Sequence, residues 1–464
     1  MKIHLLETGD AQHDPFAQCW YTTDDRRFAV PLLAMPVVGS FIPREHEVSF
    51  YDQKVHSLEG PARDCDLACI SFKTKDAKRT YRLADELRAA GTKVILGGVH
   101  ASLDPEEAAR HADAVVAGEA EGIFAQVLKD AERGQLQRIY RAPQGVALDA
   151  SPMPRFDLID NERYWVHAVQ TSRGCLVGCD FCPIQRIFGG RTRHKAVERV
   201  LAEVDRVHEI DPQKDIFFID EMFCGGDRAY QRALLAGLRQ RKIDFYCISD
   251  FKVMDLDYVE ELAESGCKML VLNMPGTCFP HEVEAIRAIQ RMGVSVWGFF
   301  MFGFSFHDAQ VFSRVADLVE ESDMKQVTLT VITPFPNTPL AQRLAATGGL
   351  LTDDTDLFDQ CHVVCAPERF DAPTLQEGFL SAWQRLEPRF AISSSSGRTT
   401  QSEHAARAIT REEGREVLHA DLQLRHERGI LGKEVDLMAA YGTDRFEVAV
   451  TPYNVLERRY SGEE

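Results

Sequence analysis

Three cysteines stand within eight residues of one another, at Cys175, Cys179 and Cys182, directly after a run that predicts a β-strand. Three thiolates on one loop form a soft-metal site. A structural zinc site normally has four ligands, and no fourth partner is near in the sequence. A four-iron four-sulfur (4Fe-4S) cluster held by three cysteines keeps one iron open for a substrate or cofactor. We therefore predict such a cluster, with zinc or a reactive thiol as alternatives.

The composition is that of an ordinary globular protein, with 45% hydrophobic and 27% charged residues over 464 positions. The formal net charge of −18 argues against binding to nucleic-acid phosphates or anionic lipid. Twelve cysteines are too few for a disulfide scaffold of this length. Met1–Asp10 predicts a strand instead of a secretory signal, and the uncharged run Ala29–Pro43 is too short to span a bilayer. We expect a cytoplasmic chain that binds neither nucleic acid nor membrane.

The first 150 residues alternate between short apolar runs and helical patterns such as Ala77–Ala90. This alternation predicts an α/β fold with a doubly wound parallel sheet, covered by helices on both faces. The expected strands are Lys2–Leu6, Val48–Tyr51, Leu67–Phe72, Lys93–Leu96 and Ala114–Ala117.

The carboxyl ends of these strands carry polar residues and glycines. In open α/β sheets ligands bind at these ends, near the point where the strand order reverses. The alternative is that the glycines only let the chain turn after a strand. The strand ends with candidate ligand-facing residues are Ser71–Thr74, Gly97–His100 and Gly118–Glu121.

A second alternating series follows a proline-rich linker at Ala142–Pro154. Six β/α units of this spacing predict a partial (β/α)6 barrel, whose chemistry would lie at the carboxyl ends of the strands. A mostly helical C-terminal segment follows, and the serine-rich run Ala391–Gln401 reads as a linker before a charged tail. The expected strands are Val166–Thr171, Ile216–Asp220, Phe245–Ser249, Met269–Asn273, Val294–Gly303 and Val327–Thr333.

The three cysteines, Phe181 just before the third of them, and their place after the first strand of the second series resemble the radical S-adenosylmethionine (radical SAM) superfamily. In that family the open iron binds SAM. One electron from the cluster cleaves SAM to methionine and a 5′-deoxyadenosyl radical, which removes a hydrogen atom from the substrate. The protein supplies binding, orientation and exclusion of side reactions.

The chain further resembles the radical SAM subgroup that carries an N-terminal cobalamin-binding domain. The match covers roughly residues 1–390 and implies a flavodoxin-like first sheet that holds cobalamin. The runs that carry it are Thr171-Ser-Arg-Gly-Cys175, Gly189–Arg193, Phe217–Glu221, Phe300–Phe304, Thr333–Pro339, Leu96–Ala101 and Ala112–Glu121. The implied domains are 1–145 for cobalamin, 155–345 for the radical SAM barrel, 346–392 for an extension that completes the core, and 393–464 for a linker and helical tail.

This resemblance assigns site residues. Cys175, Cys179 and Cys182 would hold the cluster, and Asp220 is the candidate catalytic carboxylate, although a carboxylate at a helix start is an equal alternative for it. The candidate SAM contacts are Phe181, Asp220, Ser249 and Asn273. The candidate cobalamin contacts are Ser71, Thr74, Gly97, Gly98, His100, Gly118 and Glu119.

Two features depart from the subgroup. The D-x-H-x-x-G motif that supplies an axial histidine in many cobalamin enzymes is absent, so a first domain without the corrin stays an alternative. Pro275 stands where the subgroup usually has a glutamate after the fourth barrel strand. Cys361 and Cys365 could belong to an auxiliary cluster, although buried cysteines more often pack as small hydrophobic residues.

The sequence therefore predicts a cobalamin-dependent radical SAM enzyme. The resemblance implies a C-methyltransferase that acts on an unactivated carbon of a small-molecule or natural-product-type substrate, with an external one-electron reductant of the flavodoxin or ferredoxin type. One alternative is an enzyme of the same architecture that catalyses cyclisation, rearrangement or another non-methylating radical reaction. A second is a non-catalytic iron–sulfur redox protein, although an electron carrier is better served by a fully ligated cluster.

Overall fold

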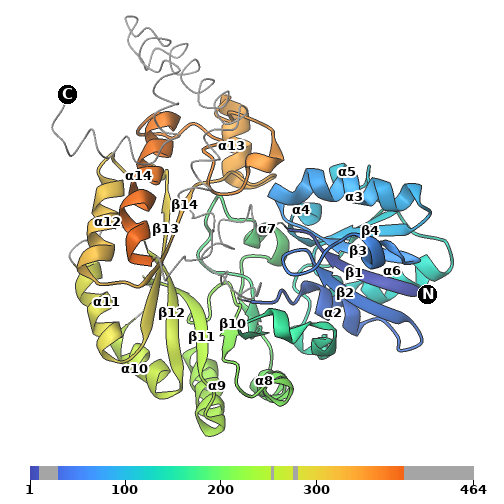
Figure 1. Cartoon of the computed structure of the whole chain (residues 1–464), viewed down its shortest axis with the longest axis horizontal. Coiled ribbons are helices and arrows are strands. Elements are labelled where there is room, and N and C mark those ends of the chain that lie inside the picture. Colours follow the sequence, from blue (N-terminus) through green and yellow to red (C-terminus); the bar gives the residue numbers. More distant parts are fainter. Residues whose placement is uncertain (10–29, 252–254, 275–280, 391–464) are drawn as a thin grey trace, which may run out of the picture.

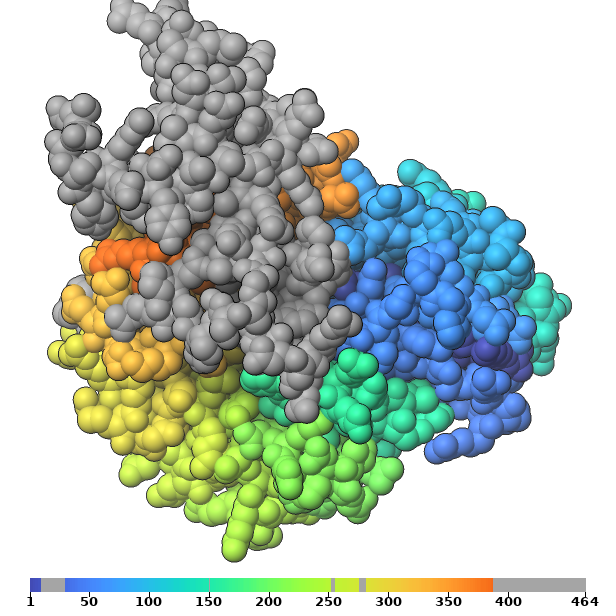
Figure 2. Space-filling model, viewed as in Figure 1, coloured from blue at the N-terminus to red at the C-terminus, as the bar shows by residue number. Residues whose placement is uncertain are grey.

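The computed structural model describes residues 1–9, 30–251, 255–274 and 281–390. Within these ranges the chain forms two α/β units that lie side by side (Figure 1). In the space-filling view the first unit, in blue, abuts the green and orange parts of the second (Figure 2). None of the described helices is both long and apolar enough to cross a membrane.

The first unit is a six-stranded sheet in which every strand is parallel to its neighbours, in the order β2-β1-β3-β4-β5-β6. This is the flavodoxin-like order, in which the order of successive strands reverses between β1 and β3. The strands are β1 (Lys2–Glu7), β2 (Glu47–Asp52), β3 (Leu67–Ser71), β4 (Lys93–Gly97), β5 (Ala114–Ala117) and β6 (Ile139–Arg141).

Helices cover both faces of this sheet because its strands are apolar on both sides. One core cluster joins Leu6 and Ile70 to the apolar side of α3, and another joins Ile3 and Leu5 to α2 and α6. The helices are α2 (Ala34–Ser40), α3 (Ala77–Ala89), α4 (Gly98–Leu103), α5 (Pro105–Ala108) and α6 (Phe124–Glu132). The doubly wound arrangement predicted for this unit is confirmed.

The second unit is a curved sheet of six parallel strands with α8–α12 along its outer side (Figure 1). The strands, in their spatial order, are β7 (His167–Val169), β10 (Ile216–Phe218), β11 (Phe245–Asp250), β12 (Cys267–Met274), β13 (Ser295–Phe302) and β14 (Gln326–Val331). The helices are α7 (Ile184–Phe188), α8 (Val197–Ile210), α9 (Arg228–Arg241), α10 (Leu256–Glu264), α11 (His281–Arg291), α12 (Val311–Glu321), α13 (Pro339–Thr347) and α14 (Ala372–Phe390). The expected partial (β/α)6 barrel is therefore present.

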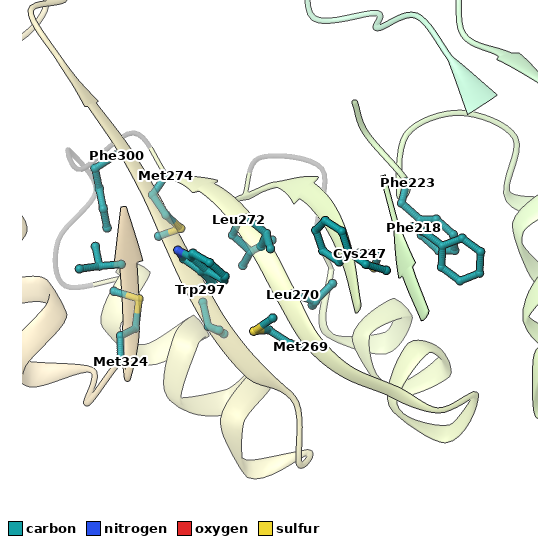
Figure 3. Close-up of a cluster of buried hydrophobic side chains, with 14 of the residues drawn as sticks. Phe218, Phe223, Cys247, Met269, Leu270, Leu272, Met274, Trp297, Phe300 and Met324 are labelled. Carbon is teal, nitrogen blue, oxygen red and sulfur yellow. The ribbon is translucent and has the colours of Figure 1, made fainter. Parts of the chain in front are cut away.

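The two faces of this sheet differ in exposure toward the carboxyl ends of β11, β12 and β13. Residues that face the helices, such as Cys247, Leu270 and Leu272, are buried and pack side by side across adjacent strands (Figure 3). On the inner face, Asp250 and Phe299 are half-buried and Asn273 is exposed. The inner face is therefore the side that can receive a ligand.

Several elements differ from the sequence-based expectation. Strand β6 and the short antiparallel pair β8 (Ser172–Arg173) and β9 (Arg193–His194) were not predicted. Helix α4 begins directly at the end of β4, where the sequence predicted a loop. The expected linker and tail after Ala391, and Pro275, lie outside the described residues.

Candidate functional site

A cavity of about 290 Å³ lies at the carboxyl ends of β1, β3 and β4, between the two units. The first unit contributes strand ends and the loop after β5, and α2 closes one side. The second unit contributes Gln170, Arg173, Ile187, Phe188 and Ile219. The cavity therefore occupies the point of strand reversal at which open α/β sheets bind ligands.

Five of the seven candidate cobalamin contacts line this cavity: Ser71, Gly97, Gly98, Gly118 and Glu119. Thr74 and His100 do not. His100 is fully buried, with Nδ1 3.2 Å from Thr74 Oγ1 and Nε2 3.6 Å from Glu107 Oε2. Because α4 starts at Gly98, the histidine turns away from the cavity and packs beside the rings of Phe72 and Tyr81. The structure therefore does not support a loop histidine that reaches the cofactor.

Gly98 has a backbone requirement that no other residue type meets. Its φ of +89° lies in the left-handed region, and a Cβ atom there would stand 2.7 Å from Ser71 Oγ and 2.8 Å from Phe72 N. We expect Gly98→Ala to lower the free energy of unfolding by about 1–3 kcal/mol and to weaken cobalamin binding, because the loop must shift into the cavity. Urea unfolding and equilibrium dialysis with hydroxocobalamin measure the two effects.

Gly134→Ala is the matched control for this substitution. Gly134 also has a positive φ, +66°, but a Cβ there meets nothing within 4 Å. The control should lower the free energy of unfolding only by the strain of a positive φ, and its cobalamin affinity should be unchanged. Equal effects of the two substitutions on cobalamin binding would contradict the role given to Gly98.

The three cysteines lie on the loop that joins β8 to α7, next to the cavity wall. All three are half-buried, and the Val177 N–H donates to Cys175 Sγ at 3.4 Å. Burial raises the pKa of each thiol, for Cys182 to about 11, and the neighbouring cysteines, Glu221 and Asp250 act in the same direction. Thiolates at this loop therefore need a positively charged partner.

The loop fits an iron–sulfur cluster in its chemistry. Its three thiols come from one short segment, and the apolar side chains of Leu176 and Val177 between them are exposed. Among the described residues, no three His, Cys, Asp or Glu side chains converge on a single metal ion. Three thiolates from one loop suit a cluster that keeps one iron open, whereas a structural zinc site normally takes four ligands.

Asp220 holds the start of the cysteine loop. It is fully buried, and its Oδ1 accepts hydrogen bonds from the backbone N–H and the hydroxyl of both Thr171 and Ser172, at 3.0 Å from the two Thr171 donors and 2.7 Å from the Ser172 hydroxyl. Burial raises the pKa of Asp220, while the donors from Ser172 and Thr171 lower it. This geometry gives Asp220 a positioning role at the start of the cluster loop, and its catalytic role stays a prediction.

Two substitutions separate these roles of Asp220. Asp220→Ala should destabilise the fold by about 3 kcal/mol and lower iron content, because it leaves buried donors without an acceptor. Asp220→Asn retains an acceptor oxygen and should keep most of the iron content and of the SAM cleavage. Iron analysis and deoxyadenosine release measure the outcome. An Asn variant that holds its cluster but has lost SAM cleavage would restore the catalytic role.

The candidate SAM residues do not all lie on the same face of the barrel sheet. Phe181 packs against Phe304 with ring centroids 5.6 Å apart, next to the cysteines. Asn273 lies on the inner face. Ser249 is fully buried on the outer face, since it pairs in register with Leu272. The following residue, Asp250, pairs with Asn273 and shares the inner face, so it is the polar residue that the sequence analysis missed.

An ion-pair network joins the cavity to the cysteine loop. Arg173, two positions before Cys175, pairs with Glu119 at 3.3 Å and with Glu121 at 2.5 Å. Arg193 pairs with Glu119 at 2.6 Å and also donates to the Val146 carbonyl at 2.5 Å. Both glutamate side chains are almost fully buried. The loop after β5 and the cluster loop are therefore held together directly.

The chain is similar to several known proteins. The family model of the B12 binding domain matches residues 27–128. The chain is 24% identical over 401 residues to bacteriochlorophyllide d C-12(1)-methyltransferase from Chlorobaculum tepidum, which covers 82% of this chain and 87% of that protein. It is 22% identical over 365 residues to the hopanoid C-2 methylase of Rhodopseudomonas palustris, covering 73% of this chain and 69% of the relative.

The fold has a solved counterpart. The radical SAM methyltransferase TsrM from Kitasatospora setae superposes with a TM-score of 0.61 at 14% identity, covering 93% of this chain and all of TsrM. Its structures hold tryptophan with a SAM analogue, or cobalamin with a 4Fe-4S cluster. These matches bear out the resemblance to cobalamin-binding radical SAM methyltransferases: the named relatives are methyltransferases, the first unit matches a B12 binding domain, and TsrM shares the fold.

Proposed function

We propose that the chain methylates an unactivated carbon of a small-molecule, natural-product-type substrate. The observation that supports this proposal is that the interdomain cavity and the cluster loop adjoin each other. Arg173 lines the cavity and stands two residues before Cys175, the first cluster cysteine. A methyl donor in the cavity and a hydrogen-abstracting group at the cluster must both reach one substrate carbon. A common wall gives them that proximity.

The residues divide into three sets under this proposal. Cys175, Cys179 and Cys182 would hold the cluster. Phe181, Asn273 and Asp250 would contact SAM at the carboxyl end of the barrel. When bound, the cluster supplies the electron for SAM cleavage and cobalamin supplies the methyl group. The cobalamin contacts would be Ser71, Gly97, Gly98, Gly118 and Glu119.

The inner face of the barrel offers two kinds of contact to the ligands. Asp250 and Asn273 lie next to each other across β11 and β12, and together they present an acceptor pair and an amide donor. Phe299 is the register partner of Asn273 on β13, and Met301 lies two residues further on the same face. This combination suits a substrate with an apolar body, which would keep water away from the reacting carbon.

This arrangement gives each part of the chain a separate role. Residues 1–145 would bind cobalamin, 155–345 would bind the cluster and SAM, and 346–392 would complete the barrel core, where Leu375 and Phe379 of α14 are fully buried. The electron would come from an external carrier of the flavodoxin or ferredoxin type. The shared class of the named relatives supports methyl transfer over cyclisation, rearrangement or a purely electron-carrying role.

Anaerobic reconstitution tests the proposal. The full chain, loaded with iron, sulfide and hydroxocobalamin, should release deoxyadenosine from SAM under reduction when a substrate is present. With SAM that carries a deuterated methyl group, mass spectrometry should show the label on a substrate carbon. The panel would begin with the substrate classes of the relatives: a chlorophyllide, a hopanoid and tryptophan. Deoxyadenosine release with a rearranged, unlabelled product would instead establish the cyclisation or rearrangement alternative, and protein that loads its cluster yet never cleaves SAM would refute an enzyme.

A further inference from the structure

Glu7 is a buried carboxyl group at the end of β1 that nothing described above uses. Its side chain lines the interdomain cavity, yet the residue is only 3% exposed. No hydrogen-bond partner for its Oε2 atom is present among the described residues. A buried polar atom without a partner costs about 1–3 kcal/mol, so its presence beside a cavity points to a partner that arrives with a ligand.

Among the described residues, the cation with the largest effect on the pKa of Glu7 is held by a neighbouring carboxylate. Asp52, its register partner on β2, accepts from Tyr164 OH at 2.9 Å and lies 3.3 Å from Lys54 Nζ. The ammonium that could pair with Glu7 is thus held by Asp52. On the other side, Ser71 of β3 donates a hydrogen bond to the Glu7 carboxyl.

The charged groups around Glu7 act on its pKa in opposite directions. Lys54 and Lys73 favour the carboxylate, and Asp52 opposes it. Tyr164 contributes a neutral hydroxyl, and His56 contacts the far side of Asp52 through the Asp52 N–H. Burial has the largest effect and raises the pKa of Glu7 to about 7, so the carboxyl group carries a proton over part of the neutral range.

We infer that Glu7 is a cobalamin-binding residue whose protonated carboxyl donates a hydrogen bond to the oxygen of one amide side chain of the corrin. The corrin ring bears acetamide and propionamide groups around its edge, and a neutral carboxylic acid complements such an amide. The inference rests on the proposed cofactor site and deepens it, because it makes cobalamin affinity dependent on pH.

The sign of the pH dependence follows from linkage. Binding favours the protonated form, so cobalamin affinity is highest below the pKa of the free carboxyl and falls as pH rises through it. If only the protonated form binds, a group with a pKa of about 7 loses about tenfold in affinity between pH 6 and pH 8. Glu7→Gln keeps an amide donor of the same shape and cannot titrate, so its affinity should be independent of pH.

The experiment is equilibrium dialysis of hydroxocobalamin against the full chain from pH 6 to pH 8, without SAM or substrate. The expected result is a steep profile for the wild-type chain and a flat one for Glu7→Gln, with Glu7→Ala several-fold weaker than Glu7→Gln throughout. Urea unfolding of each variant controls for a loss of fold. Parallel wild-type and Glu7→Gln profiles would overturn the inference and leave the cofactor site intact. A wild-type chain that binds no hydroxocobalamin at any pH would overturn both.

Discussion

Replacing Cys179 by alanine should abolish iron loading and SAM cleavage together. The three cysteines share one loop, and no other cysteine in the described part of the chain shares it, so a lost thiolate has no substitute. With two cysteine ligands left, a second iron of the cluster would lack a protein ligand, and the cluster would not persist through reduction. We expect iron content and deoxyadenosine release to fall to the level of protein without added iron.

Cys361→Ala is the control. Cys361 is fully buried in the main core of the barrel, where burial and packing account for it. Its replacement should cost roughly 1 kcal/mol of stability and leave iron content and the reduced-cluster EPR signal unchanged. Loss of iron in the Cys361 variant would establish the auxiliary cluster, and a Cys179 variant that still binds iron and cleaves SAM would defeat the ligand assignment.

The sequence was sufficient for the architecture because the architecture depends on periodicity. Alternating apolar runs and helical patterns located both sheets, and the spacing of Cys175, Cys179 and Cys182 located the cluster loop. The missed strands are short: β6 has three residues, and β8 and β9 have two each.

The orientation of single side chains was less predictable. Strand β11 alternates in burial, but its first four residues are apolar on both faces, so its sequence does not show which of Ser249 and Asp250 faces inward. Shifting the phase by one residue moves a side chain to the opposite face. The same kind of error affected His100, because a helix that starts at Gly98 rotates it away from the strand end.

The contacts between the two units could not be predicted at all. Arg173 and Glu119 are separated by 54 positions, and Arg193 and Glu119 by 74. Nothing in the composition of either loop indicates its partner. These pairs form because the two units pack against each other at the cavity. That packing depends on the whole fold and cannot be seen in a short stretch of sequence.

Glu119→Gln should therefore weaken the fold and both cofactor sites at once. The Glu119 carboxylate is almost fully buried and pairs with two guanidinium groups. Removing its negative charge leaves the positive charges of Arg173 and Arg193 without this buried partner. A loss of about 3–5 kcal/mol in the free energy of unfolding is expected. Glu106→Gln is the control: it breaks an ion pair with Arg141 whose partners are both more than half exposed, and should cost less than about 1 kcal/mol.

The same network predicts that cobalamin and the cluster bind cooperatively. Since Arg173 touches the cavity loop and leads into the cluster loop, each bound cofactor should hold the other's loop in place. By linkage, the factor by which the cluster raises cobalamin affinity equals the factor by which cobalamin raises cluster retention. Dialysis of hydroxocobalamin with iron-loaded and iron-free protein measures the first factor, and the equilibrium distribution of iron between the protein and a chelator, with and without cobalamin, measures the second. Both factors should approach one in Glu119→Gln and stay unchanged in Glu106→Gln. A Glu119 variant that keeps the full coupling would show that the ion pairs join the two units without linking their cofactors.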